Sequence, residues 1–348
     1  MTDKVLLLTP SRGLGGGIER YAATVEWVLQ SSGLAYRRMD LQGSGLKAYA
    51  TLLMAAQNYL KANPSTTRLI LAHRALLPLA VVLNRQPHIE GTSVLFHGSD
   101  VWNRRRGVRQ LAESRAMRYP GVRAVAVSNY TAGALSHMGH ATVVPPGLAN
   151  HWYQTLVEAR RERGSQGRQA IVTAFRLAAW KEKGLPEIVS AVASLDRPDL
   201  SLVICGTGEA PRELRELLSS HTFCHLRVGL SDSELASQFA AARVFVLATR
   251  MRGGRRPCGE GYGIVLQEAQ LAGAPVVAPA YGGSHEAFVE GVTGVAPVDE
   301  KAETLANVLR ELLGDAKRLA KMGNDAAAWA YESLSPVRYS ELVLSRLM

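Results

Sequence analysis

The sequence predicts an α/β protein built from two doubly wound parallel sheets. Short apolar runs alternate with helix-compatible segments along most of the chain, and this alternation is typical of βαβ units. The chain has 348 residues, the length of two ordinary domains, and its hydrophobic content of 47% is sufficient for two cores. A charged, glycine-containing stretch at 156–168 interrupts the pattern, and we interpret it as an interdomain linker.

We therefore expect an N-terminal domain over 1–155 and a C-terminal domain over 168–332. Expected strands of the first domain cover 4–10, 34–41, 68–73, 92–97, 122–128 and 141–145. Those of the second cover 170–175, 200–205, 225–228, 243–248 and 275–279. Ligands of such sheets bind at the carboxyl ends of the strands, so candidate site residues are sought there.

Composition limits the classes of partner. The net charge of +10 favours anionic partners, which include nucleotide donors, acidic lipid surfaces and nucleic acid. The three cysteines form neither a CxxC pair nor a disulfide framework, and no D-x-D or HExxH motif occurs, so we expect no metal site. The longest apolar run, 76–83, is too short to span a bilayer, and the N-terminus resembles a first strand, so we expect a cytoplasmic protein.

A glycine-rich loop follows the first expected strand. Residues 11–17 read Ser-Arg-Gly-Leu-Gly-Gly-Gly, and a helix is expected over 18–30. The amides of Gly16 and Gly17 would lie at the helix N-terminus, where an anion such as a phosphate is favoured. The spacing fits neither the dinucleotide fingerprint G-x-G-x-x-G nor the P-loop.

The segment 259–270 contains the most informative pattern. Seven residues separate Glu260 from Glu268, and glycines at 261 and 263 follow the first carboxylate. A helix that begins near Gly263 would direct its free N–H groups into the loop. One carboxylate would then lie in the loop and one on the helix, with an anion site between them, as a nucleotide diphosphate-sugar requires. The alternative is a surface loop followed by an ordinary amphipathic helix.

Further candidates stand at other strand ends. His97 follows an expected strand, where it could polarise a hydroxyl or bind a sugar, although a lone histidine is more often structural. Arg176, together with Lys181 or Lys183, could neutralise a diphosphate. Gly206 ends the next strand and would allow close approach of a nucleotide to the backbone.

Two segments are strongly basic. The first, 103–119, includes four arginines that we assign to the acceptor or membrane side: Arg104, Arg105, Arg106 and Arg109. A solvated helix face is the alternative, and the lack of interleaved aromatic residues counts against binding of single-stranded nucleic acid. The second segment, 250–258, precedes Glu260 and would either order on the substrate or form a flexible insert.

Several motifs together carry a family resemblance. They are Glu-Gly-Tyr-Gly-Ile-Val-Leu-Gln-Glu at 260–268, Ala-Gly-Ala-Pro-Val-Val at 272–277, the glycines at 282–283, Gly-Gly-Ile-Glu-Arg-Tyr at 16–21, the Arg-Leu to Lys-Gly segment at 176–184 and His-Gly at 97–98. With these motifs, nearly the whole chain resembles the retaining GT-B glycosyltransferases of the group 1 type (glycosyltransferase family 4). The resemblance implies two Rossmann-like domains facing a cleft, with the donor mainly on the C-terminal domain. It also implies that a final helix at about 333–348 crosses back to the N-terminal, acceptor-side domain.

The resemblance also implies roles for the candidate residues. Glu260 would hold donor sugar hydroxyls and Glu268 the ribose. The amides around Gly261, Tyr262, Gly263, Ile264 and Val265 would hold sugar and phosphate. Arg176 and Lys183, helped by Gly16 and Gly17, would neutralise the diphosphate, and His97 would contact the transferred sugar. Because the Arg176–Lys183 segment is longer than usual in the family, the choice between Lys181 and Lys183 stays open.

The implied activity is transfer of a hexose, with its configuration retained, from a UDP- or GDP-linked sugar to an acceptor hydroxyl in glycan, glycolipid or glycoconjugate synthesis. The acceptor would be a glycan, a lipid-linked sugar or a small molecule. The nucleotide-sugar is a co-substrate, and we expect no cofactor or metal. Peripheral contact with an anionic membrane at its inner face is an open possibility. The alternatives are a GT-B-shaped nucleotide-sugar epimerase and a basic nucleic-acid-binding protein.

Overall fold

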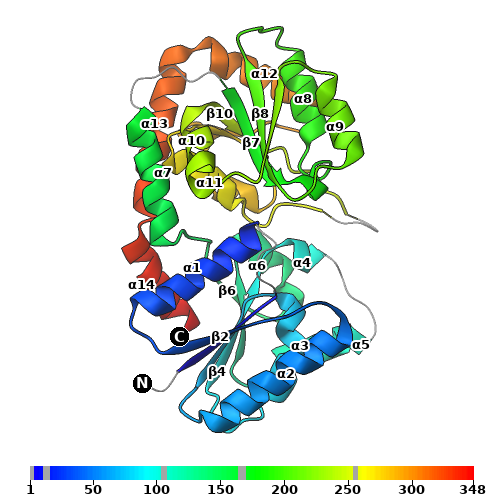
Figure 1. Ribbon diagram of the computed structural model, residues 1–348, viewed down its shortest axis with the longest axis vertical. Coiled ribbons are helices and arrows are strands. Elements are labelled where there is room, and N and C mark those ends of the chain that lie inside the picture. The colour runs from blue at the N-terminus through cyan, green and yellow to red at the C-terminus, as the bar shows by residue number, and fades with distance from the viewer. Residues whose placement is uncertain (1–3, 11–15, 103–107, 164–169, 254–257) are drawn as a thin grey trace. The chain divides into compact units, whose positions relative to one another are not determined.

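The computed structural model describes residues 4–10, 16–102, 108–163, 170–253 and 258–348 (Figure 1). These residues divide into two compact units. Unit 1 contains the described residues of 4–149 and 337–348, and unit 2 contains those of 150–253 and 258–336. Each unit is built around its own parallel sheet, which confirms the expected fold class.

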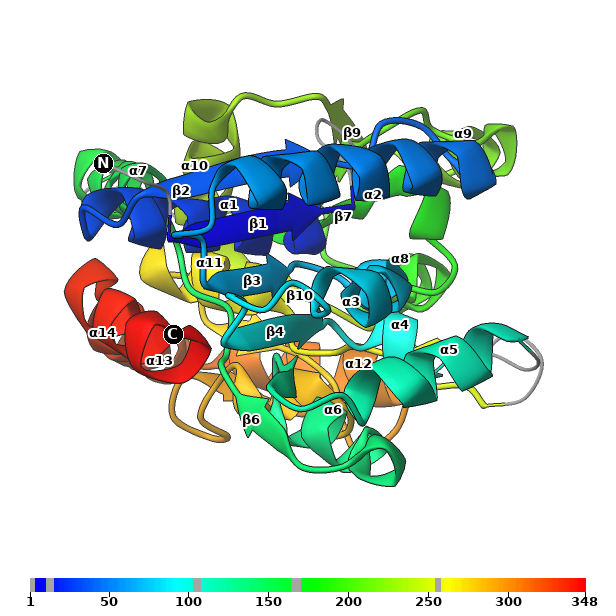
Figure 2. The same ribbon diagram turned by 90° about the horizontal axis from the view of Figure 1, so that it is seen from below.

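Unit 1 has a six-stranded parallel sheet of order β2-β1-β3-β4-β5-β6. The strands are β1 (Val5–Thr9), β2 (Tyr36–Asp40), β3 (Arg68–Leu71), β4 (Gly91–Phe96), β5 (Val122–Ala126) and β6 (Ala141–Val143). Strands β1, β3 and β4 lie side by side in Figure 2. The direction of winding reverses between β1 and β3, and the crevice outside the carboxyl ends of such a strand pair is the usual ligand site.

Helices cover both faces of this sheet. They are α1 (Gly17–Ser31), α2 (Gly45–Ala62), α3 (Leu77–Leu83), α4 (Ser99–Trp102), α5 (Val108–Met117), α6 (Asn129–Ala134) and α14 (Pro336–Leu347), with 3-10 turns η1 (Arg74–Leu76) and η2 (Ser136–Met138). Side chains alternate between the faces of a strand, and Leu6 and Leu8 of β1 pack in one cluster with apolar residues of α2, α3 and α5. On the opposite face, Ser93 of β4 donates to the carbonyl of Leu347 at 3.2 Å, so the C-terminal helix belongs to unit 1 as expected.

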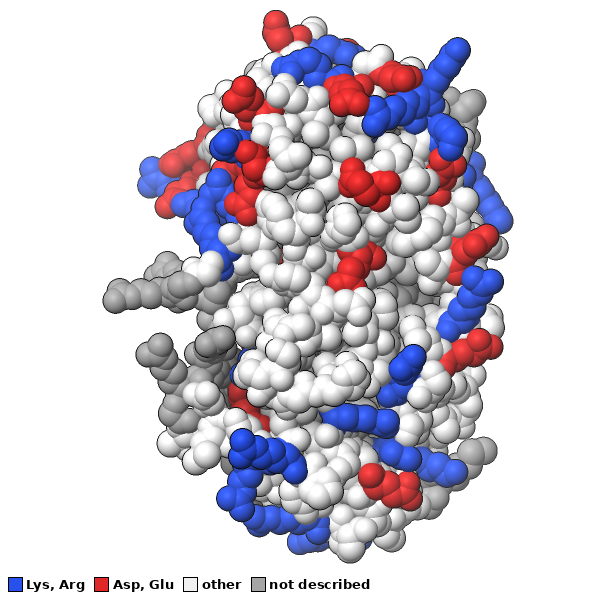
Figure 3. Space-filling view, turned by 180° about the vertical axis from the view of Figure 1, so that it is seen from behind, with Lys and Arg blue, Asp and Glu red and all other residues white. Residues whose placement is uncertain are grey.

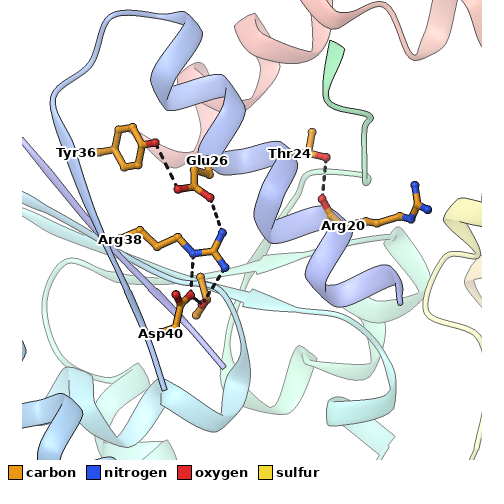
Figure 4. Close-up of polar contacts among 7 residues, drawn as sticks. Arg20, Thr24, Glu26, Tyr36, Arg38 and Asp40 are labelled. Carbon is orange, nitrogen blue, oxygen red and sulfur yellow. Dashed lines mark hydrogen bonds and ion pairs between the residues drawn. The ribbon is translucent and has the colours of Figure 1, made fainter. Parts of the chain in front are cut away.

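An ionic network joins α1 to the edge strand β2 (Figure 4). The guanidinium of Arg38 forms an ion pair with Glu26 of α1 and donates to Asp40 Oδ1 at 2.7 Å. Tyr36 donates to Glu26 at 3.4 Å. These side-chain contacts hold α1, the helix that follows the glycine loop, in a fixed position relative to β2.

Unit 2 has a six-stranded parallel sheet of order β12-β11-β10-β7-β8-β9. The strands are β7 (Ala170–Arg176), β8 (Ser201–Thr207), β9 (Cys224–Val228), β10 (Ala242–Val246), β11 (Val276–Val277) and β12 (Gly294–Val295). The winding reverses between β7 and β10, which pair in parallel, so a ligand crevice is expected beyond their carboxyl ends. Strand β12 was not among the strands expected from the sequence.

Helices of unit 2 are α7 (Asn150–Arg163), α8 (Leu185–Ala193), α9 (Arg212–Ser219), α10 (Asp232–Ala241), α11 (Ile264–Leu271), α12 (Ala302–Gly314) and α13 (Ala316–Ser333), with 3-10 turns η3 (Leu177–Ala179) and η4 (Gly283–Glu286). Helices α8, α9 and α12 lie on one side of the sheet in Figure 1, and their leucines share one core cluster with the strands. Helix α10 begins with a capping box, in which Ser231 and Glu234 exchange two hydrogen bonds.

The linker expected at 156–168 is wrong for the part that the structure describes. Residues up to Arg163 belong to α7. The signal was present, because Trp152, Tyr153, Leu156 and Val157 recur with helical spacing and all are buried. The charged residues between and after them occupy the remaining helix surface, and they had suggested a solvated linker.

Candidate functional site

In unit 2, the carboxylate of Glu260 lies beyond the end of β10 and is held by two donors. Lys183 Nζ lies 2.6 Å from Glu260 Oε2, and the two side chains are 24% and 15% exposed. The hydroxyl of Thr249 donates to the same oxygen at 2.9 Å. Both contacts use Oε2, so the carboxylate has a fixed orientation while part of it stays accessible to solvent.

The loop after Glu260 is shaped by glycine. Gly263 adopts the left-handed conformation with φ 82° and caps α11, which begins at Ile264 as the sequence predicted. The amide of Gly283 donates to the carbonyl of Glu260 at 2.9 Å. A Cβ on Gly283 would lie 1.8 Å from the carbonyl oxygen of Gly261. The glycines at 261–263 and 282–283 therefore allow two backbone loops to lie in direct contact.

Glu268 lies on α11 and is only 3% exposed. Its Oε1 accepts a hydrogen bond of 2.9 Å from the indole Nε1 of Trp152, which comes from α7. The sequence analysis missed Trp152 because it placed this residue in the N-terminal domain 1–155, whereas α7 belongs to unit 2. Glu260 and Glu268 thus bracket the loop and the first turn of α11, as expected from their spacing.

The side chains of the loop itself are mostly buried. Tyr262 is 5% exposed, and burial raises the pKa of its phenol far above the usual range. Ile264 is 9% exposed, and Val265 is half-buried. These side chains pack within unit 2. A phosphate or sugar would therefore meet the backbone amides of this loop and not its side chains.

The candidate cations separate into two groups. Lys183 pairs with Glu260, whereas Lys181 forms an ion pair with Glu213 of α9 and lies 5.0 Å from the ring centroid of Trp180. Arg176 is the exposed last residue of β7, at the point where the winding of the sheet reverses. The structure therefore brings Lys183 and not Lys181 to Glu260.

Gly206 near the end of β8 has a packing reason to be glycine. A Cβ at this position would lie 2.2 Å from Cδ2 of Leu177, the residue after Arg176. From the sequence we expected the lack of a side chain at Gly206 to let a nucleotide approach the backbone. In the structure, Cδ2 of the core residue Leu177 occupies this space.

The basic segment 250–258 is anchored where the structure describes it. Arg250 forms an ion pair with Glu187 of α8, and the amide of Met251 donates to Glu300 Oε1 at 2.7 Å. Arg252 and Cys258 form an antiparallel bridge. Residues 254–257 lie outside the described residues. The described ends of the segment are therefore fixed to unit 2.

In unit 1, His97 follows β4 as expected and lies against the end of β3. Its Nε2 is 2.8 Å from the carbonyl oxygen of Ala72, and a carbonyl can only accept, so Nε2 carries the proton. Burial lowers the pKa of His97, and the nearby Asp100 opposes this shift only in part. The neutral ring packs edge-on against Tyr21. Its Nδ1 is consequently a hydrogen-bond acceptor.

A second imidazole, from His73, stacks on His97 at a centroid distance of 5.8 Å. Asp100 connects the two residues, because its Oδ1 accepts from the amide of His97 at 2.9 Å and its Oδ2 lies 3.7 Å from His73 Nε2. Neither His73 nor Asp100 had been singled out in the sequence. The signal available was their position directly after β3 and β4, which are paired neighbours.

Other expected residues of unit 1 are described only in part. Gly16, with φ 97°, is the N-cap residue of α1 and precedes Gly17 at the start of this helix. Residues 11–15 lie outside the described residues, as do Arg104, Arg105 and Arg106. For Arg109 the backbone lies in α5, but its side chain is outside the description.

The described residues contain neither a cluster of metal ligands nor a membrane-spanning helix. Across 4–10, 16–102, 108–163, 170–253 and 258–348, no group of three or more His, Cys, Asp or Glu side chains is placed to hold a metal ion. Within those same ranges, no helix has both the length and the apolar character needed to cross a membrane.

Comparison with known families identifies the chain. Residues 158–329, about half of the chain, match the family model described as glycosyl transferases group 1. Over these residues, the chain belongs to this family. The matched segment contains Glu260, Glu268, Lys183 and the glycine loop between the glutamates, so the family assignment rests on the unit that carries the candidate site.

Curated relatives of this group 1 glycosyl transferase resemble it over part of its length. A GDP-mannose-dependent alpha-(1-6)-phosphatidylinositol monomannoside mannosyltransferase of Mycolicibacterium smegmatis is 32% identical over 220 residues, which are 60% of this chain and 57% of the relative. A D-inositol 3-phosphate glycosyltransferase of Pseudarthrobacter chlorophenolicus is 32% identical over 222 residues, covering 59% of this chain and 50% of the relative. The chain thus spans little more than half the length of the curated relatives it matches.

A solved structure extends the likeness to both units. Sucrose-phosphate synthase from Thermosynechococcus elongatus superposes with a TM-score of 0.80 over 98% of each chain, at 17% identity. That similarity shows the fold, and with the two six-stranded sheets it confirms the GT-B architecture of this group 1 glycosyl transferase.

Proposed function

We propose that this group 1 glycosyl transferase moves a hexose from a nucleotide diphosphate-sugar to an acceptor hydroxyl, with retention of anomeric configuration. The observation that carries the proposal is the arrangement of Glu260 and Glu268. One carboxylate lies before the glycine loop and the other on α11, and between them lies the N-terminus of that helix, where the N-cap residue is a glycine. A nucleotide diphosphate-sugar consists of a sugar, a diphosphate and a ribose, in that order. The arrangement matches it, because a helix end that can bind an anion lies between two groups that can bind hydroxyls.

Glu260 would accept hydrogen bonds from donor sugar hydroxyls, and Glu268 from the ribose. The amides from Gly261 to Val265 would meet sugar and phosphate oxygens. Lys183 and Arg176 would neutralise the negative charge that grows on the leaving diphosphate, and stabilisation of such developing charge is usually a large part of catalysis. Lys183 is favoured over Lys181 because its ammonium lies 2.6 Å from the Glu260 carboxylate.

Gly16 and Gly17 of unit 1 would add backbone amides for the diphosphate. His97 would contact the transferred sugar. With Nε2–H donated to Ala72, its Nδ1 is the atom that can accept a sugar hydroxyl proton in a hydrogen bond. The proton of the acceptor hydroxyl would pass to the leaving phosphate, so no strong protein base is needed.

The charge distribution favours an anionic acceptor. Residues 1–149 contain 17 of the 40 Lys and Arg but only 7 of the 30 Asp and Glu, so the whole excess of +10 lies in this segment. On the face that Figure 3 presents, unit 1 has basic side chains with few acidic neighbours. The names of the relatives point to GDP-mannose as donor and to phosphorylated inositol compounds as acceptors, and we propose the same classes here.

Helix α5 offers a surface for peripheral contact with an anionic membrane. Val108 is 86% and Leu111 is 71% exposed, and Arg115 and Arg118 are also exposed. Val108, Leu111 and Arg115 recur at intervals of three and four, so they form one stripe along the helix, and Arg118 follows its last residue. Apolar side chains with adjacent arginines match a lipid surface of negative charge.

The donor site is tested by thermal unfolding of the wild type and of Glu268→Gln with UDP, GDP, ADP and their hexose conjugates. A ligand that binds the native state raises the midpoint. We expect one base to stabilise the wild type and to do so less in Glu268→Gln. Absence of a shift with every nucleotide would refute the donor site. Product from an inositol-containing acceptor, analysed by NMR for its anomeric configuration, tests transfer and retention.

Membrane contact is tested by sedimentation with vesicles of phosphatidylcholine and an anionic phospholipid. Reversal of Arg104, Arg105 and Arg106 to Glu, or the pair Val108→Ser and Leu111→Ser, should reduce the bound fraction. Arg212→Glu on the exposed surface of α9 in unit 2 is the control. Equal binding by all variants would count against the docking surface.

A further inference from the structure

Trp152 connects α7 to a glutamate of the candidate donor site. Its indole Nε1 donates to Glu268 Oε1 at 2.9 Å, and the two residues are 5% and 3% exposed. The two helices, α7 and α11, pack against each other within unit 2. The hydrogen bond therefore joins two buried side chains that are 116 positions apart in the sequence.

A buried carboxylate requires donors to offset the cost of its desolvation. The indole N–H meets this requirement with a neutral group, so the charge of Glu268 is not cancelled by an ion pair at this contact. A carboxylate offers about four lone-pair positions, and the indole hydrogen bond occupies one of them. The rigid ring of Trp152 also limits the positions that the carboxylate can take.

The neighbouring residue on α7 has a different partner. Tyr153 donates its hydroxyl to the backbone carbonyl of Tyr331 on α13 at 2.9 Å. Tyr153 is 4% exposed, so it matches Trp152 in helix, burial and number of donors. Its hydrogen bond anchors α7 to α13, whereas that of Trp152 ends on Glu268. Substitution of Tyr153 therefore tests the anchoring of α7, and substitution of Trp152 tests the contact with Glu268.

We propose that Trp152 is a positioning residue for nucleotide binding, whose indole N–H holds the Glu268 carboxylate in place to accept the ribose hydroxyls of a nucleoside diphosphate. The inference rests on the proposed function, since it deepens the role of Glu268 there. Trp152 acts through Glu268, and its loss should affect the donor's ribose and not its phosphates or sugar.

The test compares Trp152→Phe with Tyr153→Phe in the full chain. Phenylalanine keeps an aromatic ring and removes the donor in both cases. Dissociation constants are measured by calorimetry for GDP and, in parallel, UDP, and for the 2′,3′-dideoxy analogue of each. A hydrogen bond to a charged group corresponds to roughly tenfold in affinity or more, so Trp152→Phe should weaken ribonucleotide binding by about that factor.

The decisive quantity is the ratio of the two dissociation constants, dideoxy over ribo, within one variant. This ratio does not depend on how much of the protein is folded. We expect a large ratio for wild type and Tyr153→Phe, and a ratio near one for Trp152→Phe. A Trp152→Phe protein that keeps the wild-type ratio would overturn the proposal, even if it is less stable.

Glu268→Gln distinguishes failure of this inference from failure of the proposed function. If Glu268→Gln binds GDP and UDP as the wild type does, the assignment of Glu268 to the ribose is itself wrong. If Glu268→Gln loses the ribose preference while Trp152→Phe retains it, only the positioning role of Trp152 is wrong. In steady-state assays, Trp152→Phe should raise the donor KM with little change in kcat.

Discussion

Lys183 and Glu260 form a 2.6 Å ion pair in unit 2, whereas Lys181, two residues earlier, pairs with Glu213 on another helix. The two lysines are close in sequence but extend to different carboxylates. The turn between η3 and α8 places one ammonium beside the candidate donor loop, and the other lies with exposed residues of α9. The two lysines therefore allow a cation of the candidate site to be compared with a cation of the surface.

The first prediction uses this comparison. Lys183→Met should lower kcat/KM by about 10²–10³, the usual effect of removing one electrostatic stabiliser. Lys181→Met should change activity little, because its ion pair with Glu213 is exposed and screened by solvent. Steady-state kinetics with the donor found in the thermal panel checks both. An equal loss in the two variants would argue that the ammonium beside Glu260 has no special role.

The second prediction concerns the contact between the two glycine loops. Gly283→Ala would put a Cβ 1.8 Å from the carbonyl oxygen of Gly261, and backbone must move to relieve the clash. We expect a loss of stability of about 1–3 kcal/mol, typical of overpacking, together with weaker nucleotide binding. Urea unfolding and calorimetry measure the two effects.

Gly314→Ala is the control for the loop contact. Gly314 is the last residue of α12, and no atom would lie within 4 Å of an added Cβ there. This variant should keep wild-type binding and stability. Full nucleotide binding by Gly283→Ala would show that the spacing between the loops is not important for the site.

The third prediction follows from the lowered pKa of His97. Burial lowers this pKa in the folded state, with a smaller opposing effect of Asp100 and the carbonyl of Ala72. The unfolded chain has the ordinary histidine pKa of about 6.5, so between the two values the unfolded state binds more protons. The free energy of unfolding therefore decreases as the pH falls below about 6.5, until the pH reaches the pKa of His97 in the folded state.

Denaturant unfolding at pH 5 to 8 measures this loss. The wild type should lose stability towards pH 5 more steeply than His97→Gln, which has no proton to take up at this position. His137→Gln is the matched control, because it makes the same substitution at an exposed histidine of η2. Identical slopes for wild type and His97→Gln would contradict a buried neutral imidazole.

The sequence predicted those parts of the site that depend on local pattern. The spacing from Glu260 to Glu268 and the glycine at 263 predicted the loop and the start of α11, because a left-handed residue directly before a helix has a local signature. The βα alternation predicted both sheets. Strand ends also placed His97 correctly, since a parallel sheet brings all carboxyl ends to one edge.

Contacts between distant segments could not be predicted in the same way. Trp152 reaches Glu268 across 116 positions, and nothing local to either residue indicates the other. The stacking of His73 on His97 depends on the pairing of β3 with β4. Lys183 was distinguished from Lys181 only by the course of a turn. Strand order and side-chain direction decide such contacts, and a single sequence shows them weakly.

The last prediction concerns the buried ion pair between Arg74 and Glu113, which contacts the backbone of Asp100. Arg74 donates to Glu113 Oε2 through Nε at 3.1 Å and Nη2 at 2.7 Å, and both residues are buried. Arg74 Nη1 also donates to the carbonyl of Asp100 at 2.8 Å. The guanidinium thus joins η1, α4 and α5, and it fixes the backbone of the residue that accepts the amide hydrogen bond of His97.

Removal of either residue takes away the ion-pair partner of a buried charge, so Arg74→Met and Glu113→Leu should each lower the free energy of unfolding by about 3–5 kcal/mol. The double variant should be more stable than either single one, because it buries neither charge of the pair. Urea unfolding of the four proteins gives the coupling, and additive losses would contradict it. Since only Arg74 also binds Asp100, the double variant should keep a disturbed His97, visible as a shifted imidazole pKa in NMR titration.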